Sequence, residues 1–171
     1  MKKGFTMIEL IFVIVILGIL ASVAIPRLAA TREDAEISAA VANLRTLVSD
    51  VSAYYTVKST FDSNTKWNEI TNVSLAVTTT NNTAAVGSNA TAHLKVGGKD
   101  CIGVHLVNKA TTGTTTTPAH IKFTTNTTNS SSGACKQVVD SEPVKAYIDS
   151  KVGSTSNAIA VGSSTSVYTT K

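Results

Sequence analysis

Residues 3–26 read KGFTMIELIFVIVILGILASVAIP, and this stretch decides what kind of chain follows it. Between residues 10 and 25 no side chain is charged, and Ser22 carries the only polar one. As an α-helix rising about 1.5 Å per residue, residues 5–25 would span roughly 31 Å, the thickness of the hydrocarbon core of a bilayer. The sequence therefore predicts a membrane-crossing helix near the N-terminus.

One residue of this stretch does not fit an ordinary secretory signal peptide. A signal peptide has some support, because Ser22, Val23 and Ala24 form a small-x-small cleavage site after an apolar core. Glu9, however, places a carboxylate in the apolar stretch, which costs on the order of 3 kcal/mol at mid-membrane and less near an end. An ionisable residue in such a segment indicates a function and needs a partner.

The same stretch closely resembles the leader and N-terminal helix of type IV pilins and of the pseudopilins of type II secretion. The shared features are a short basic leader, Gly-Phe, a Thr-x-x-Glu step, an uninterrupted apolar run and a late proline. The resemblance implies that a prepilin peptidase cuts after Gly4 and methylates the new N-terminal amine of Phe5. It also implies that Phe5, Glu9, Gly18 and Pro26 serve in assembly.

Physical chemistry agrees with these roles. Cleavage after Gly4 would create a positive amine at Phe5, and no other cation lies near the depth of Glu9 once the leader is removed. A carboxylate and an amine relieve each other's desolvation by pairing, so the amine of an incoming subunit could dock on Glu9 of a subunit already placed. Gly18 and Pro26 weaken a helix, and we expect bending or melting between them in a packed filament. Close helix packing is the other interpretation of Gly18.

Residues 27–57 continue the helix as an amphipathic segment. Apolar residues recur there at steps of three and four, which is typical of a helix face that packs on a core. The members of this apolar stripe are Ile37, Ala40, Val41, Leu44, Leu47, Val48, Val51, Tyr54 and Tyr55. The expected fold is pilin-like α+β, a long N-terminal helix packed on a small antiparallel sheet. Residues 1–4 would be a leader, 5–26 the transmembrane or filament-core helix, 27–57 its continuation and 58–171 a globular head.

The head gives weaker local signals. A single helical turn is predicted around Trp67, with the indole as an anchor, followed by a surface loop over residues 78–92. A short helix near residues 142–152 would begin with Ser141 as its N-cap. The predicted strands are residues 75–77, 93–96, 101–107 and 120–125, with 158–161 and 166–169 as candidates for a last edge strand. Those between residues 93 and 125 would form an antiparallel meander.

The cysteines and histidines leave little material for a metal site. Cys101 and Cys135 are expected to form a disulfide that closes a loop, because an exported chain folds in an oxidising compartment. A free thiol or a metal ligand is the alternative. His93, His105 and His120 are expected to be surface or half-buried strand residues, although His93 and His105 could meet across a hairpin as a two-His metal site. We expect no metal and no cofactor.

Hydroxyl groups dominate the surface composition. Residues 111–117 are a low-complexity threonine run and would form a hairpin connection. Five Asn-x-Ser/Thr sequons, which chance supplies in a chain this rich in Thr and Asn, begin at Asn72, Asn81, Asn89, Asn126 and Asn129. Threonine-rich loops can also carry O-glycans, and low charge with many hydroxyls suits an exposed surface even without sugar.

The charge and the motifs argue against a nucleic-acid-binding protein and against an enzyme. Lys2 and Lys3 supply half of the net charge of +4, so no basic footprint for nucleic acid remains. No carboxylate pair, nucleophile constellation or phosphate loop is evident, and we expect a structural protein rather than an enzyme. The resemblance implies a type IV pilus subunit that polymerises with copies of itself, after processing by prepilin peptidase and with an inner-membrane assembly machinery. It would lie in the inner membrane before assembly and in a cell-surface filament afterwards.

Two alternatives stay open. A pseudopilin of a type II secretion or DNA-uptake system would share the N-terminal chemistry and form a short periplasmic filament. An Asp-rich calcium loop, which is a mark of the major pseudopilin, is not evident in the C-terminal part. A secreted binding module would instead lose its first residues as a signal peptide and begin at Ile25.

Overall fold

The computed structural model describes residues 4, 6–62, 64–77, 91–112, 115–126, 128–130 and 133–162, without the side chains of residues 29 and 30. Some predictions concern residues outside this range. They are the amine of Phe5, the sequons at Asn81 and Asn89, the strand candidate at residues 166–169 and residues 78–90 of the loop predicted over 78–92. The end of that loop was predicted too late, because Ala92 begins strand β2 (Ala92–Val96). The chain divides into two compact units, Met1–Ala35 and Glu36–Lys171.

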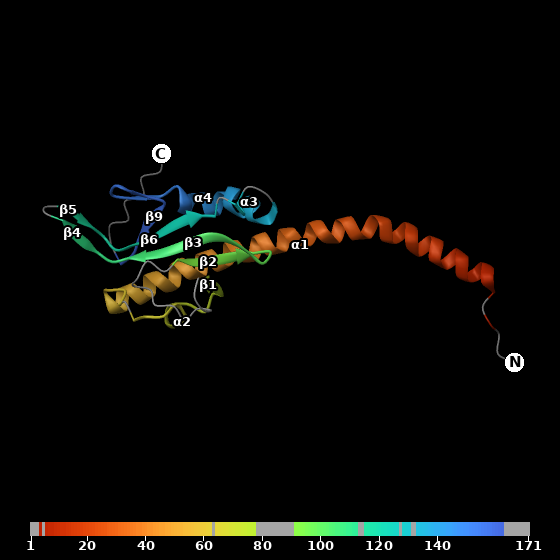
Figure 1. Cartoon of the computed structure of the whole chain (residues 1–171), viewed down its shortest axis with the longest axis horizontal. Coiled ribbons are helices and arrows are strands. Elements are labelled where there is room, and N and C mark those ends of the chain that lie inside the picture. The colour runs from red at the N-terminus through yellow and green to blue at the C-terminus, as the bar shows by residue number, and fades with distance from the viewer. Residues whose placement is uncertain are drawn as a thin grey trace. The chain divides into compact units, whose positions relative to one another are not determined.

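The longest element is helix α1, Met7–Lys58, which begins in the first unit and ends in the second (Figure 1). The helix continues through both Gly18 and Pro26. Among the described residues, α1 is the one helix long and apolar enough to cross a membrane, judged by its length and composition. The predicted long N-terminal helix is therefore confirmed, while the bending between Gly18 and Pro26 concerns a filament and stays a prediction.

The second unit holds the remaining elements. Its further helices are α2 (Trp67–Ile70), α3 (Gly133–Asp140) and α4 (Glu142–Ile148). Its strands are β1 (Leu75–Val77), β2 (Ala92–Val96), β3 (Lys99–Val107), β4 (Ala110–Thr112), β5 (Thr115–Thr117), β6 (His120–Thr125), β7 (Lys151–Val152), β8 (Thr155–Ser156) and β9 (Ala158–Ala160). Five of them form an antiparallel sheet in the order β1-β2-β3-β6-β9, while β4–β5 and β7–β8 form separate pairs. The predicted α+β fold with a small antiparallel sheet is confirmed.

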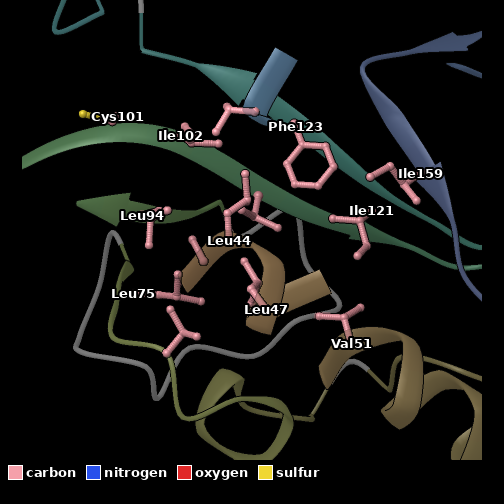
Figure 2. Packing of buried hydrophobic residues seen from close by; sticks show 14 of the residues in the cluster. Leu44, Leu47, Val51, Leu75, Leu94, Cys101, Ile102, Ile121, Phe123 and Ile159 are labelled. Carbon is pink, nitrogen blue, oxygen red and sulfur yellow. The ribbon is translucent and has the colours of Figure 1, made fainter. Parts of the chain in front are cut away.

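The core of the second unit lies between α1 and the five-stranded sheet. Leu44, Leu47 and Val51 of α1 are fully buried, and Figure 2 shows them pointing toward the strands. Opposite them, Leu94 of β2 pairs directly with Ile102 of β3, which places both side chains on one face. Burial of each of these leucine side chains stabilises the fold by about 1.5–3 kcal/mol. Ala40 of the apolar stripe is also buried in this core. The other members of the stripe are partly buried against the core, namely Ile37, Val41, Val48, Tyr54 and Tyr55.

Several local signals in the head are also confirmed. Trp67 begins α2 and is fully buried, as expected of an anchor. Between β2 and β3, Gly97 and Gly98 have φ of 57° and 78°. A two-residue hairpin turn needs positive φ at both positions, so glycine suits both. Strands β2, β3 and β6 then form the predicted meander.

The last helix begins after Ser141 as predicted, but the capping bond and the end of the helix differ from the prediction. Ser141 precedes α4, but its hydroxyl donates to the carbonyl oxygen of Val138 at 2.6 Å and makes no side-chain cap. The helix ends at Ile148 rather than near residue 152. The cause is non-local, because the Ser150 hydroxyl donates to the carbonyl oxygen of Ala158 at 2.7 Å and the chain turns into β7.

Candidate functional site

The N-terminal end of α1 is held by reciprocal bonds between Thr6 and Glu9. The carboxylate oxygen Oε2 of Glu9 accepts from the backbone N–H of Thr6 at 2.8 Å and from its hydroxyl at 2.6 Å. In return, the backbone N–H of Glu9 donates to Oγ1 of Thr6 at 3.4 Å. This arrangement is a capping box, in which the residue before the helix and the residue three positions later satisfy each other's free N–H groups.

The capping box adds to the sequence argument about Glu9. That argument gave the carboxylate a single partner, an amine at residue 5. The structure gives it a second set of partners, both on Thr6 of the same chain. A need for a cation is therefore not the only reason for a carboxylate at this position. The Thr-x-x-Glu spacing is itself a helix-start signal and could have predicted these bonds.

The other predicted site residues lie apart from one another along the chain. Gly4 is exposed, and a Cβ built on it would have no atom within 4 Å. Gly18 has the same open space on its side of the helix. Pro26 lies within α1, and Phe5 is outside the described residues. Of the predicted assembly residues that the structure describes, Glu9 is the one whose side chain bonds another side chain, and its partner Thr6 was not singled out for a role.

The first part of α1 presents a continuous set of exposed apolar side chains. Their exposed fractions run from 41% at Ile16 to 81% at Met7. The set comprises Met7, Ile8, Leu10, Ile11, Phe12, Val13, Ile14, Val15, Ile16, Leu17, Ile19, Leu20, Val23, Ile25 and Leu28. A contiguous apolar surface of this kind marks contact with a membrane or with other protein.

The structure contains the disulfide between Cys101 and Cys135. It joins β3 to α3 with a Cα–Cα distance of 5.5 Å, and both residues are buried. No element was predicted over residues 133–140, although Ala134, Cys135, Val138 and Val139 recur there at helical spacing. The bond fastens this short helix to the sheet, far along the chain from the apolar segment.

Two histidines, His93 and His105, are half-buried as expected, whereas the expectation of a surface or half-buried residue is wrong for His120. Nε2 of His105 lies 3.1 Å from Oγ1 of Thr91, and partial burial, followed by the charges of Lys122 and His93, lowers the pKa of His105. His120 is buried, with Nδ1 2.9 Å from the carbonyl oxygen of Pro118. Within the described ranges, no three His, Cys, Asp or Glu side chains gather into a group that could hold a metal ion.

One comparison with known proteins matches the N-terminal segment, and a second gives a partial alignment to a secretion protein. The family described as the prokaryotic N-terminal methylation motif matches residues 1–25. The chain is also 42% identical over 53 residues to type II secretion system core protein G of Dickeya chrysanthemi. That alignment covers 31% of this chain and 35% of the relative, so the chain spans about a third of the length of the curated relative it matches. No solved structure matched the chain.

These matches confirm the resemblance inferred from the leader and the apolar helix. The methylation motif covers the stretch in which the capping box and most of the exposed apolar side chains lie. The chain carries the prokaryotic N-terminal methylation motif of pilins and pseudopilins at residues 1–25, at the head of a pilin-like α+β architecture.

Proposed function

We propose that the chain is a structural subunit of a type IV pilus, an extracellular filament built from copies of this chain. The observation that carries the proposal is the exposed apolar part of α1, most of which lies within the methylation motif. In the membrane these side chains contact lipid. In a filament they contact the same helices of other copies, where burial contributes roughly 25 cal/mol per Å².

Processing comes first in this proposal. A prepilin peptidase of the inner membrane removes residues 1–4 and methylates the amine of Phe5. The exposure of Gly4, with open space around its Cα, supports access by a protease. The chain is then a substrate and a building block rather than a catalyst.

Assembly uses the carboxylate of Glu9. The bonds from Thr6 hold this carboxylate at the first turn of α1. An amine at Phe5 of an incoming copy, delivered by the inner-membrane assembly machinery, pairs with it and sets the axial register. Gly18 and Pro26 let the helix bend as copies pack.

A pseudopilin of type II secretion is the second candidate function. It is favoured by the similarity to the core protein G of such a system. Its N-terminal chemistry would be the same, and its filament would be short and periplasmic. Electron microscopy of producing cells separates the two, since the pilus proposal expects long surface filaments that disappear when the gene is deleted.

Three substitutions separate the charge of Glu9 from its capping bonds. Glu9→Gln keeps an oxygen that can accept from Thr6 but removes the charge, whereas Glu9→Leu removes both. Thr6→Val removes the hydroxyl of the capping box and leaves the carboxylate. We expect all three chains to be cleaved normally, filaments to fall steeply in both Glu9 variants, and Thr6→Val to retain most filaments. Normal filaments from Glu9→Gln would contradict the pairing.

A further inference from the structure

Ser22 carries the one polar side chain of residues 10–25, and it lies four residues before Pro26. Both residues are inside α1, which continues through this segment as a helix. The hydroxyl of Ser22 donates to the carbonyl oxygen of Ile19 at 2.7 Å. The hydroxyl is therefore bonded to the backbone of its own helix, three residues back.

Two backbone carbonyls of this segment differ from ordinary helical carbonyls in their bonding. In an α-helix the carbonyl of each residue accepts from the N–H four residues later. Pro26 has no N–H, so the carbonyl of Ser22 loses its usual donor. The carbonyl of Ile19, whose usual donor is the N–H of Val23, also accepts the Ser22 hydroxyl. Ser22 thus takes part in the bonding of both carbonyls.

The hydroxyl lowers the cost of opening the helix here in an apolar environment. A backbone carbonyl that loses its N–H partner in lipid finds no water to replace it, so opening is costly. A serine hydroxyl that bonds back to the preceding turn can satisfy such a carbonyl, and bonds of this kind often bend a helix. When the N–H of Val23 leaves the Ile19 carbonyl, the Ser22 hydroxyl remains bonded to it.

Two other positions of the first unit lack this combination. Thr31 makes a similar bond, with its hydroxyl donating to the carbonyl oxygen of Leu28 at 3.0 Å. Four residues after Thr31, however, stands Ala35, which has an N–H to donate. Gly18 has open space on its side of the helix and no side chain that could replace a backbone partner.

We propose that α1 opens in the segment from residue 19 to residue 26, and that Ser22 is the positioning residue whose hydroxyl lowers the free energy of this opening. The opening releases the amides of residues 23–25 from the carbonyls of residues 19–21. It is a property of the single chain, whereas its use for bending in a filament rests on the proposed function.

The test is amide hydrogen exchange of the full chain in detergent micelles, followed by NMR. Ser22→Thr keeps the hydroxyl, whereas Ser22→Val has the shape of threonine without the hydroxyl and a similar helix propensity. In Ser22→Thr the amides of residues 23–25 should exchange as in the parent chain. In Ser22→Val they should exchange roughly two- to tenfold more slowly, the range that corresponds to one ordinary hydrogen bond.

Three further variants are matched controls for the same amides. Thr31→Val removes a similar bond where no proline follows, and Gly18→Ala adds a methyl group into open space. Neither should slow exchange at residues 23–25. Pro26→Ala restores the missing N–H, so the difference between Ser22→Thr and Ser22→Val should shrink in that background.

Equal exchange in Ser22→Thr and Ser22→Val would overturn the proposal. Slowing by Gly18→Ala as large as that by Ser22→Val would also overturn it, because the glycine would then set the opening.

Filament counts by electron microscopy test the use of the opening, and Ser22→Val should give fewer filaments than Ser22→Thr. Equal counts, with a difference in exchange, would contradict a role in assembly. A parent chain that forms no filaments would contradict the proposed function and leave the exchange result standing.

Discussion

The two parts of α1 differ in how their apolar side chains are covered. Leu17, in the first unit, is 58% exposed, whereas Leu47, in the second, is completely buried. The residue type and the secondary structure are the same at both positions. The difference lies in the rest of the chain, which supplies a sheet for Leu47, while Leu17 requires a surface that belongs to another molecule.

The sequence pattern already distinguishes the two parts. Residues 10–25 are apolar on every side of the helix, as in helices surrounded by lipid or by other helices. From residue 37 onward, apolar residues recur at steps of three and four and leave a polar side. A helix with one apolar side can be covered by its own domain, and a helix that is apolar all round cannot be covered by one sheet face.

A matched pair of leucine substitutions should give the largest difference between the parts. Leu47→Ala removes a fully buried side chain and should lower the free energy of unfolding of the second unit by about 3–5 kcal/mol. Leu17→Ala should leave that value unchanged, because the side chain contacts no core in the single chain. Chemical denaturation of the detergent-solubilised full chain, followed by the fluorescence of Trp67, measures both. Equal effects would contradict the comparison.

The disulfide should make the next largest contribution to the free energy of unfolding, and both of its cysteines lie in the second unit. Replacing both Cys101 and Cys135 with serine opens a loop with a sequence separation of 34. The chain-entropy estimate for a loop of this size is about 3.8 kcal/mol, an upper value for the loss in free energy of unfolding. The same denaturation experiment checks it. A thiol assay on the unreduced native chain should find no reactive thiol, and two reactive thiols would refute the bridge.

A contact just beyond the end of α1 should have a smaller effect on the free energy of unfolding. Oδ1 of Asn108 accepts from the backbone N–H of Phe61 at 2.7 Å, and its Nδ2 donates to the carbonyl oxygen of Phe61 at 2.8 Å. Asn108→Ala removes both bonds and should lower the free energy of unfolding by about 1–2 kcal/mol. Asn108→Asp keeps the acceptor and loses the donor, so its loss should be smaller. Melting curves of the two variants that coincide with the parent chain would disprove the contact.

The smallest expected effect is a pH dependence from His105. Burial and neighbouring positive charge lower its pKa in the folded chain below the ordinary value of 6.5. The unfolded chain then binds a proton more readily, so stability is full above pH 6.5 and decreases as the pH falls through 6.5 toward the folded pKa. His105→Gln should remove this component. The check is denaturation of both chains at about pH 5 and about pH 7.5; a parent chain that gains stability at the acidic pH relative to His105→Gln would contradict the sign.

The sequence predicted those elements whose signal lies within a few neighbouring residues. The apolar stripe of α1, the glycine turn at Gly97 and Gly98 and the alternation of Ile121 and Phe123 in β6 all produce signals within a few residues. The end of α4 gave no such signal, because the bonds that follow it join Ser150 to Ala158 of β9, eight residues further along the chain.

In the candidate site, too, some features could be predicted from the sequence and others were not. Glu9 was singled out because a carboxylate is unusual in an apolar run, and that signal needs no structure. Its bonds to Thr6 were not predicted, although the Thr-x-x-Glu spacing is local. The sequence argument considered only a positively charged partner for the carboxylate. Helix α3 was not predicted, although Cys135 and Val138 lie three residues apart on its buried side, as in an amphipathic helix.

The most direct test of the central claim is the N-terminus of the mature chain. Mass spectrometry of the protein isolated from membranes and from filaments identifies the first residue and any methyl group on it. The proposed processing predicts a chain that begins at Phe5 with a methylated amine, and an uncut precursor for Gly4→Val. A mature chain that begins at Ile25, without the apolar helix, would contradict the account and leave only a secreted globular unit.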